Sequence, residues 1–137
     1  MNNLDNVLSL IIPIFFGAIG YWIATFYIQP ILYYKKIRQK ILTDLIFYAN
    51  AVKPLKDADN ERYYQRHESN RLASCELTAC IETLPYFYKI HLKCKGVDIE
   101  NASLTLMKLS NCSNEMEAAT FTDDIARALG FKIKLFR

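Results

Sequence analysis

Charged side chains are absent from residues 7–34, although charged residues make up 23% of the chain. All 17 Lys and Arg residues follow this stretch, and of the 14 acidic residues only Asp5 precedes it. Residues 7–28 (VLSLIIPIFFGAIGYWIATFYI) rise about 1.5 Å each and cover the roughly 30 Å core of a bilayer. Their only small hydroxyl side chains are Ser9 and Thr25, too few for the polar face of a soluble helix. The sequence therefore predicts one transmembrane helix over residues 7–30.

Basic residues are also absent before this stretch, where the chain reads MNNLDN. A cleaved signal peptide begins with a positively charged segment, so this N-terminus does not fit one. The positive-inside rule places the basic flank after the span in the cytosol. We expect a single-pass protein of the bacterial inner membrane, with residues 1–6 outside and residues 31–137 as a cytosolic domain. Tyr33 and Tyr34 should then lie at the inner headgroup level.

Catalytic signatures are missing too. The chain has no nucleophile elbow, no phosphate loop and no HExxH pair. It has four glycines, and Gly17 and Gly20 lie in the span. His67 and His91 have no acidic partner at a fixed spacing. We expect no enzyme and no cofactor. The small net charge of +3 falls short of the basic face that binds duplex nucleic acid.

Four cysteines are present, and a reducing cytosol keeps such residues as free thiols. Cys75 and Cys80 lack the two-residue spacing that is common in zinc sites, although His91 and Cys94 follow them. On a helix the first two side chains would lie about 140° apart. We expect small buried hydrophobic side chains here and at Cys112, and no metal site.

Proline and glycine mark the ends of the expected elements. Gln29-Pro30 should end or kink the membrane helix, and periodic apolar residues predict helices over residues 31–52, 61–84, 86–95, 99–110 and 115–129. Asp98 is the expected cap of the helix at 99–110, and Gly96 and Gly130 are stop signals. Thr122 is a candidate internal start within the last helix. The fold class is therefore all-α, a transmembrane helix followed by a small cytosolic helical bundle, and the tail FKIKLFR fits a short C-terminal strand or an extended stretch.

Small residues recur along one face of the span, at Pro13, Gly17, Gly20 and Ala24. Such a stripe lets helix backbones approach closely in lipid, although Gly and Pro are common in membrane helices in any case. A single span has no partner within its own chain. We therefore expect a homo-oligomer, of three or more chains, that packs through this face.

A basic cluster follows the span at Lys35, Lys36, Arg38 and Lys40. Its main interpretation is a topology signal that also contacts lipid headgroups. A lipid-binding or gating collar is the alternative.

The helix over residues 61–84 divides into a polar first half and an apolar second half. The second half should turn Leu72, Ala73, Leu77, Cys80, Ile81 and Leu84 inward. The first half should project a cluster rich in arginine and tyrosine, formed by Arg62, Tyr63, Tyr64, Arg66, His67, Asn70 and Arg71. Guanidinium groups bind phosphates and aromatic rings stack on bases, so the cluster is a candidate site for a cyclic nucleotide or another polyanion. An ordinary solvated face, partly neutralised by acidic residues, is the alternative.

Three segments carry a family resemblance: IQPILYYKKIRQKILTDLIFYANAVK, SNRLASCELTACIETLPYFYK and ENASLTLMKLSN. They resemble a widespread group of small bacterial membrane proteins with one N-terminal span, a Pro-containing exit, a basic helix ending in Phe-Tyr-Ala-Asn and a Leu-Pro-aromatic break. The match covers residues 26–130, and since most members carry no assigned activity it implies architecture more than function. The layout is also similar to that of membrane-anchored ancillary effectors of type III CRISPR systems, whose oligomeric helical domain binds a cyclic tetra-adenylate. That second likeness is an analogy of size and plan.

Together these features lead to two expectations of function. The first is a homo-oligomeric membrane effector or sensor of antiviral defence, in which the cytosolic domain binds an anionic nucleotide signal such as a cyclic oligoadenylate and the membrane helix perturbs the bilayer. The alternative is a single-pass membrane anchor or adaptor that recruits a cytosolic protein.

Overall fold

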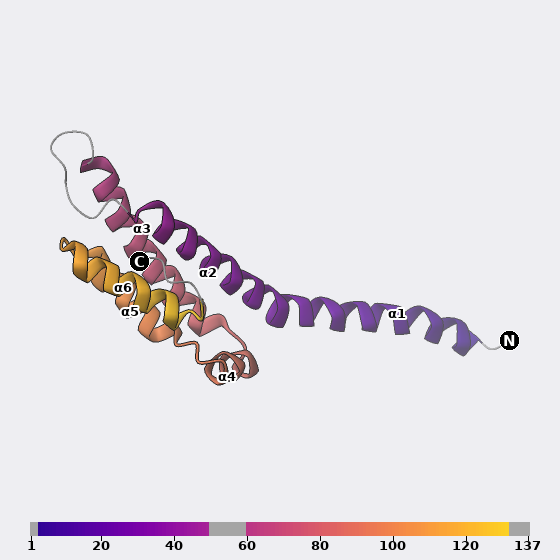
Figure 1. Cartoon of the computed structure of the whole chain (residues 1–137). Coiled ribbons are helices and arrows are strands. Elements are labelled where there is room, and N and C mark those ends of the chain that lie inside the picture. The colour runs from indigo at the N-terminus through magenta and orange to yellow at the C-terminus, as the bar shows by residue number, and fades with distance from the viewer. Residues whose placement is uncertain (1–2, 50–59, 132–137) are drawn as a thin grey trace.

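A long N-terminal helix projects from a packed helical domain (Figure 1). The computed structural model describes residues 3–49 and 60–131. Its elements in chain order are α1 (Asn3–Ile23), the π-helical turn η1 (Ala24–Ile28), α2 (Gln29–Phe47), α3 (Asn60–Thr83), α4 (Tyr86–Cys94), α5 (Ile99–Ser110) and α6 (Glu115–Ala128). No strand occurs among these described residues, which confirms the all-α prediction. The tail that fits a strand falls at residues 132–137, outside them.

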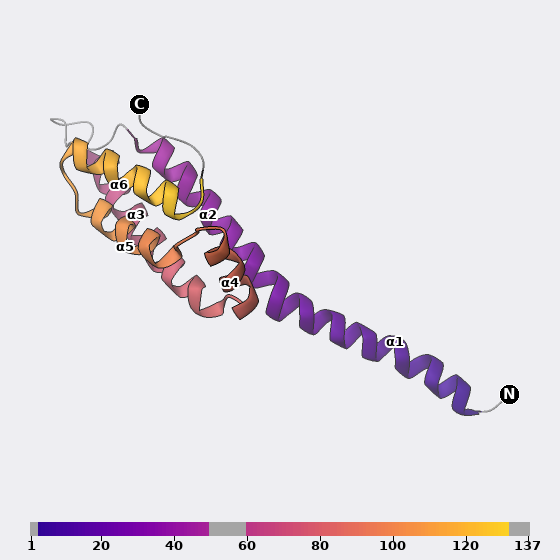
Figure 2. The same ribbon diagram turned by 60° about the horizontal axis from the view of Figure 1, so that its bottom comes forward.

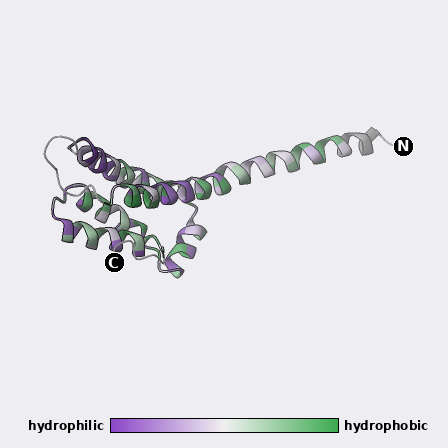
Figure 3. Ribbon diagram, turned by 45° about the horizontal axis from the view of Figure 1, so that its top comes forward, coloured by the Kyte–Doolittle hydropathy of each residue, from purple (hydrophilic) through white to green (hydrophobic). Residues whose placement is uncertain are grey.

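The projecting helix matches the apolar stretch of the sequence. The helical run Ser9–Phe47 is long and apolar enough to cross a membrane, and its most apolar window is not buried against the rest of the protein. In Figure 3, deep purple, which marks hydrophilic residues, is confined to α2 and the helical domain. Residues 3–49 and 60–131 thus contain one candidate membrane span, near the N-terminus, as length and composition define it.

Pro30 kinks the helix but does not end it. A proline has no N–H to donate, and its ring crowds the carbonyl one turn earlier. The chain accommodates this by widening the preceding turn into η1, where the N–H of Gln29 donates to the carbonyl oxygen of Ala24, five residues back. Such π turns are a known cause of helix bends, and Figure 1 shows the change of direction between α1 and α2. The candidate span therefore continues directly into the domain through a bend.

The core of the domain forms where α3 packs between α2 and α5, with α6 against α5. Leu77 and Cys80 of α3, Leu106 of α5 and Ile125 of α6 are almost completely buried. Small hydroxyl residues let α3 and α5 approach closely, because they bond across the contact. Ser74 Oγ donates to the Ser103 carbonyl oxygen at 2.8 Å, and Thr78 Oγ1 lies 2.7 Å from Ser103 Oγ.

The helix ends follow the predicted signals. The Asp98 carboxylate accepts a hydrogen bond from the backbone N–H of Asn101 at 3.0 Å and caps α5. Gly96 and Gly130 have φ values of +72° and +74°, a region that favours glycine because it has no Cβ. A Cβ at Gly130 would also lie 3.0 Å from Val97 Cγ2. Thr122 is not a helix start: α6 runs through it without a break, and its buried hydroxyl donates to the Ala118 carbonyl oxygen.

One predicted placement in the helices is wrong. Leu72 is 52% exposed, since it lies one residue, or about 100°, away from the inner face that holds Ala73 and Leu77. Tyr34, at the start of α2, is buried in the core and faces the domain. It lies on the same face of α2 as Ile37, and its ring centre is 6.1 Å from that of Tyr88. Burial raises the pKa of Tyr34 to about 12.

The cysteines are free thiols, as expected, but only half of them are core residues. Cys80 and Cys112 are buried, whereas Cys75 and Cys94 are exposed, which corrects the prediction for the latter two. Cys75 and Cys80 lie on different sides of α3 because five residues turn a helix well past its starting direction. Within the described residues no group of three or more His, Cys, Asp or Glu side chains could hold a metal ion.

Truncating Leu77 tests the central place of α3. Leu77→Ala should lower the free energy of unfolding by about 2–5 kcal/mol, because it leaves a cavity where α2, α3 and α5 meet. Leu72→Ala on the same helix removes the same atoms from an exposed position and should change it by under about 0.5 kcal/mol. Thermal or urea unfolding of the detergent-solubilised protein, followed by circular dichroism, measures both. Equal losses for the two variants would contradict this packing.

Candidate ligand-binding cavity

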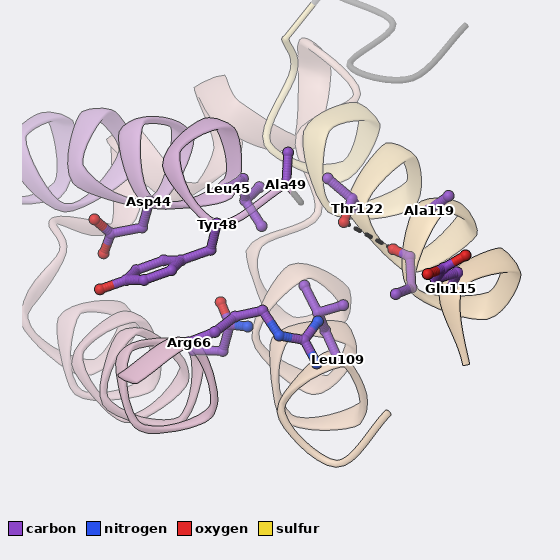
Figure 4. Close-up of a pocket in the computed structure, with 11 residues that line it drawn as sticks. Asp44, Leu45, Tyr48, Ala49, Arg66, Leu109, Glu115, Ala119 and Thr122 are labelled. Atoms are coloured by element: carbon purple, nitrogen blue, oxygen red, sulfur yellow. Dashed lines mark hydrogen bonds between the residues drawn. The ribbon is translucent and has the colours of Figure 1, made fainter. Parts of the chain in front are cut away.

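A cavity of about 340 Å³ opens among four helices of the domain. It lies where α2 ends, between the first half of α3 and the facing parts of α5 and α6 (Figure 4). This volume is at the lower end of the range for small-molecule sites, about 300–1000 Å³. Its lining consists of Asp44, Leu45, Tyr48, Ala49, Arg66, Asn70, Leu109, Glu115, Ala118, Ala119 and Thr122.

Arg66 is the cationic residue of this lining, and it is 3% exposed. Its Nη2 donates to the Cys112 carbonyl oxygen at 2.8 Å and lies 3.3 Å from His67 Nε2. Its Cζ lies 5.7 Å from the centre of the Tyr63 ring. Within the described residues no carboxylate forms an ion pair with it. Burial accordingly lowers the pKa of Arg66, since the charged form loses its hydration.

Two buried donors of the lining have no hydrogen-bond partner among the described residues. They are Arg66 Nε and Asn70 Nδ2. An unmade hydrogen bond at a buried polar group costs about 1–3 kcal/mol, and more when the group is charged. Both groups carry N–H bonds, so both need an acceptor. A ligand that brings oxygen acceptors, above all an anionic one, would relieve this cost.

Carboxylates and an aromatic ring line the other parts of the cavity. In Figure 4 the side chains of Asp44 and Tyr48 from α2 and of Arg66 from α3 face the space between these helices, and Glu115 comes from α6. Asp44 accepts a hydrogen bond from Ser69 Oγ at 2.7 Å. The cavity therefore offers buried donors, carboxylate acceptors and an aromatic ring to one ligand.

The arginine- and tyrosine-rich cluster predicted from the sequence is divided by the fold. Arg66 and Asn70 are buried in the cavity wall and do not project into solvent, because α3 packs between α2 and α5 on that face. Tyr63 is half-buried, and its ring centre lies 4.2 Å from that of His67 with the planes tilted by 54°. The remaining three cluster residues are exposed and outside the lining: Arg62, which donates to the Phe47 carbonyl oxygen at 3.4 Å, Tyr64 and Arg71.

The basic cluster after the span also divides. Lys35 and Lys36 are exposed. Arg38 instead donates to the Gly130 carbonyl oxygen at 3.2 Å and lies over the Phe131 ring. Lys40 pairs with Glu76 of α3 at 3.1 Å. Half of the cluster thus ties α2 to the domain, and half is available to headgroups.

The small-residue stripe lies on the projecting helix. Pro13, Gly17 and Gly20 are exposed and Ala24 is half-buried. A Cβ added at Gly17 or Gly20 would meet nothing within 4 Å. No part of the described chain therefore covers this face.

The contribution of α2 and α6 to the cavity is not predicted from the sequence. Asp44 had a signal, because it lies three residues after Ile41 and four before Tyr48, on the apolar side of its helix. A carboxylate there is unusual in a packed face. Glu115 had none, since an acidic residue in the first turn of a helix is ordinary.

Comparison with protein family models, curated proteins and solved structures finds no match to this chain. The resemblance to small bacterial membrane proteins and the likeness in plan to CRISPR effectors therefore stay predictions.

The contact between His67 and Arg66 gives a test of the buried charge. Burial lowers the pKa of His67 below its ordinary value of 6.5, and the Arg66 charge lowers it further. The unfolded chain then binds the proton more tightly than the folded one, so stability is lost as the pH falls through the ordinary value. In a His91→Gln background the remaining imidazole can be titrated by NMR. Arg66→Met should raise the pKa of His67, and an unchanged pKa would contradict the charged contact.

Proposed function

We propose that the protein is a homo-oligomeric membrane effector or sensor whose helical domain binds an anionic, nucleotide-derived ligand in the Arg66 cavity. One observation carries the proposal: the end of α2 lines the cavity, and the start of α2 continues through η1 into the candidate membrane span. A ligand in the cavity therefore touches the helix that enters the membrane. Because no loop separates this helix from the span, ligand binding in the cavity is coupled to the position of the span.

Contacts along the whole of α2 support this coupling. Tyr34 packs on Tyr88 near its start, and Lys40 pairs with Glu76 in its middle. Asp44 accepts from Ser69 close to the cavity. Because α2 is held to the domain at each of these levels, it moves with the helices around it as one body.

The chemistry of the lining favours a nucleotide over a simple anion. The unpartnered donors of Arg66 and Asn70 suit phosphate oxygens. Asp44 can accept from ribose hydroxyl or base amino groups, and the Tyr48 ring offers a stacking surface. A bare anion would satisfy these two donors but would make no use of Asp44 or of the Tyr48 ring.

The size of the cavity limits how the ligand binds. About 340 Å³ suits a ligand of one nucleotide at most. A cyclic oligoadenylate, which the likeness in plan to CRISPR effectors brings into consideration, would have to bind across several chains. A role in antiviral defence is part of the proposal only when the ligand is a cyclic oligoadenylate.

The charge pattern supports the membrane topology of the proposal. Lys35 and Lys36 are exposed just after the span, and no Lys or Arg precedes it. The positive-inside rule then gives a single-pass protein of the inner membrane, with its N-terminus outside and the helical domain in the cytosol.

A membrane adaptor is the second candidate. Ile46 is 55% exposed and Phe47 is 59% exposed at the end of α2, and Tyr64 is 68% exposed on α3. Adjacent exposed apolar side chains of this kind often mark protein contacts. This version predicts a stable complex with a cytosolic protein that depends on Phe47.

Ligand binding is tested with the full-length protein in detergent and a panel of nucleoside phosphates and cyclic mono- and oligonucleotides. A binder should raise the melting temperature, and calorimetry should give its affinity. Arg66→Gln should weaken binding about tenfold or more, because a charged hydrogen bond contributes about 1.5–3 kcal/mol. Arg71→Gln, which removes an exposed arginine of the same helix outside the cavity, should bind as the unchanged protein does. If no member of the panel binds, the nucleotide proposal is wrong.

Self-association is tested at the small-residue stripe. Gly17→Leu combined with Gly20→Leu should shift the mass of the detergent-solubilised protein from an oligomer toward a monomer, because larger side chains keep the helix backbones apart. Phe15→Leu, on the opposite face of α1, is the matched control and should leave the mass unchanged. An oligomer that survives the double substitution would place the contact elsewhere.

A further inference from the structure

The short helix α4 lies at the end of the domain nearest the projecting helix, as the two views in Figures 1 and 2 agree. A ring contact fixes this position: Phe87 of α4 lies 5.8 Å from Tyr27, with the planes 28° apart. Tyr27 belongs to η1, at the end of the apolar stretch. The helix α4 therefore sits at the level where the candidate span leaves the bilayer.

One face of α4 is fixed in the core. Leu92 is buried, and Tyr88 packs its ring against that of Tyr34. The opposite face is apolar and open, since Tyr86 is 79% exposed, Phe87 54% and Ile90 45%. Steps of one, three and four residues bring these three side chains onto the same side of the helix. In water such a contiguous apolar face is unfavourable.

The charges around this face are all of one sign on α4. The helix contains Lys89 and Lys93 and no acidic residue, and Lys95 follows it. Lys93 and Lys95 are exposed, as are Lys35 and Lys36 at the start of α2. Basic residues at this level attract the anionic headgroups of a bilayer, about 1 kcal/mol for each residue near the surface.

We propose that α4 is an interfacial helix that lies on the bilayer, with Tyr86, Phe87 and Ile90 among the lipids and the lysines on anionic headgroups. Aromatic and aliphatic side chains on one face and lysines beside them are the pattern of helices that lie in a membrane surface. The inference rests on the membrane span of the proposed function. It adds a second attachment, which sets the orientation of the domain on the membrane.

Depth-dependent quenching tests the inference in the full-length protein, held in lipid nanodiscs that contain phosphatidylglycerol and brominated lipid. Trp22 is the single tryptophan of the chain and reports the span. In a Trp22→Phe background, Phe87→Trp and Ile90→Trp report α4. Met116→Trp is the control. Met116 is 80% exposed in the first turn of α6. Its neighbour Glu115 lines the cavity, which lies at the end of α2 away from the span.

We expect bromolipid to quench both α4 reporters several-fold more than the Met116→Trp control, and phosphatidylcholine discs to reduce this difference. Quenching of Trp22 without quenching of either α4 reporter would overturn the inference and leave the membrane span in place. Absence of quenching at Trp22 as well would overturn the span and with it the proposed function. Agreement of the two α4 reporters guards against a local disturbance of the Phe87–Tyr27 contact.

Discussion

The structure depends on one continuous helix that forms both the candidate membrane span and a wall of the helical domain. From Ser9 to Phe47 the chain stays helical, first as an exposed apolar rod and then as a wall of the domain. The change of role occurs within a few residues, where η1 widens the helix ahead of Pro30. Beyond it, Tyr34, Ile37, Ile41 and Leu45 recur at steps of three and four and bury one face. The remaining helices pack relative to that face.

Buried polar groups pair with one another at the α3–α5 contact, whereas two in the cavity do not. In the α3–α5 contact, Ser74, Thr78 and Ser103 satisfy one another at distances of 2.7 to 3.1 Å. At the cavity, Arg66 Nε and Asn70 Nδ2 have no partner within the described part of the chain. Tyr34 Oη, Arg38 Nε and Asp123 Oδ1 also lack partners among these residues, but in the cavity two such groups line one space, and one of them belongs to a buried guanidinium without a carboxylate. Such a cost is characteristic of binding sites, where a ligand supplies the missing acceptor.

Spacing along the sequence determined how much could be predicted. The long apolar N-terminal helix, the breaks at Pro85 and Gly96 and the cap at Asp98 depend on local chemistry, and the structure contains all of them. The burial of Arg66 and Asn70 depends on tertiary packing. Continuing the inner face of α3 backward from Leu77 through Ala73 in steps of three and four reaches Asn70 and then Arg66, so the register held the signal. The sequence interpretation placed these residues in solvent because they are polar. The helices that converge on α3 to enclose a cavity cannot be identified from local sequence.

In the proposed function, the distance between the cavity and the candidate span restricts the form of any response. The 19 residues of α2 span about 28 Å, and a helix held along this length does not carry a local distortion from end to end. A ligand that draws α3 and α6 toward the end of α2 would therefore tilt the domain as a body. The widened turn η1 lacks the regular hydrogen-bond ladder and is the natural pivot. If α4 also holds the domain at the bilayer, as we propose, that tilt would bend the chain at η1, between the two attachments, and would displace the span.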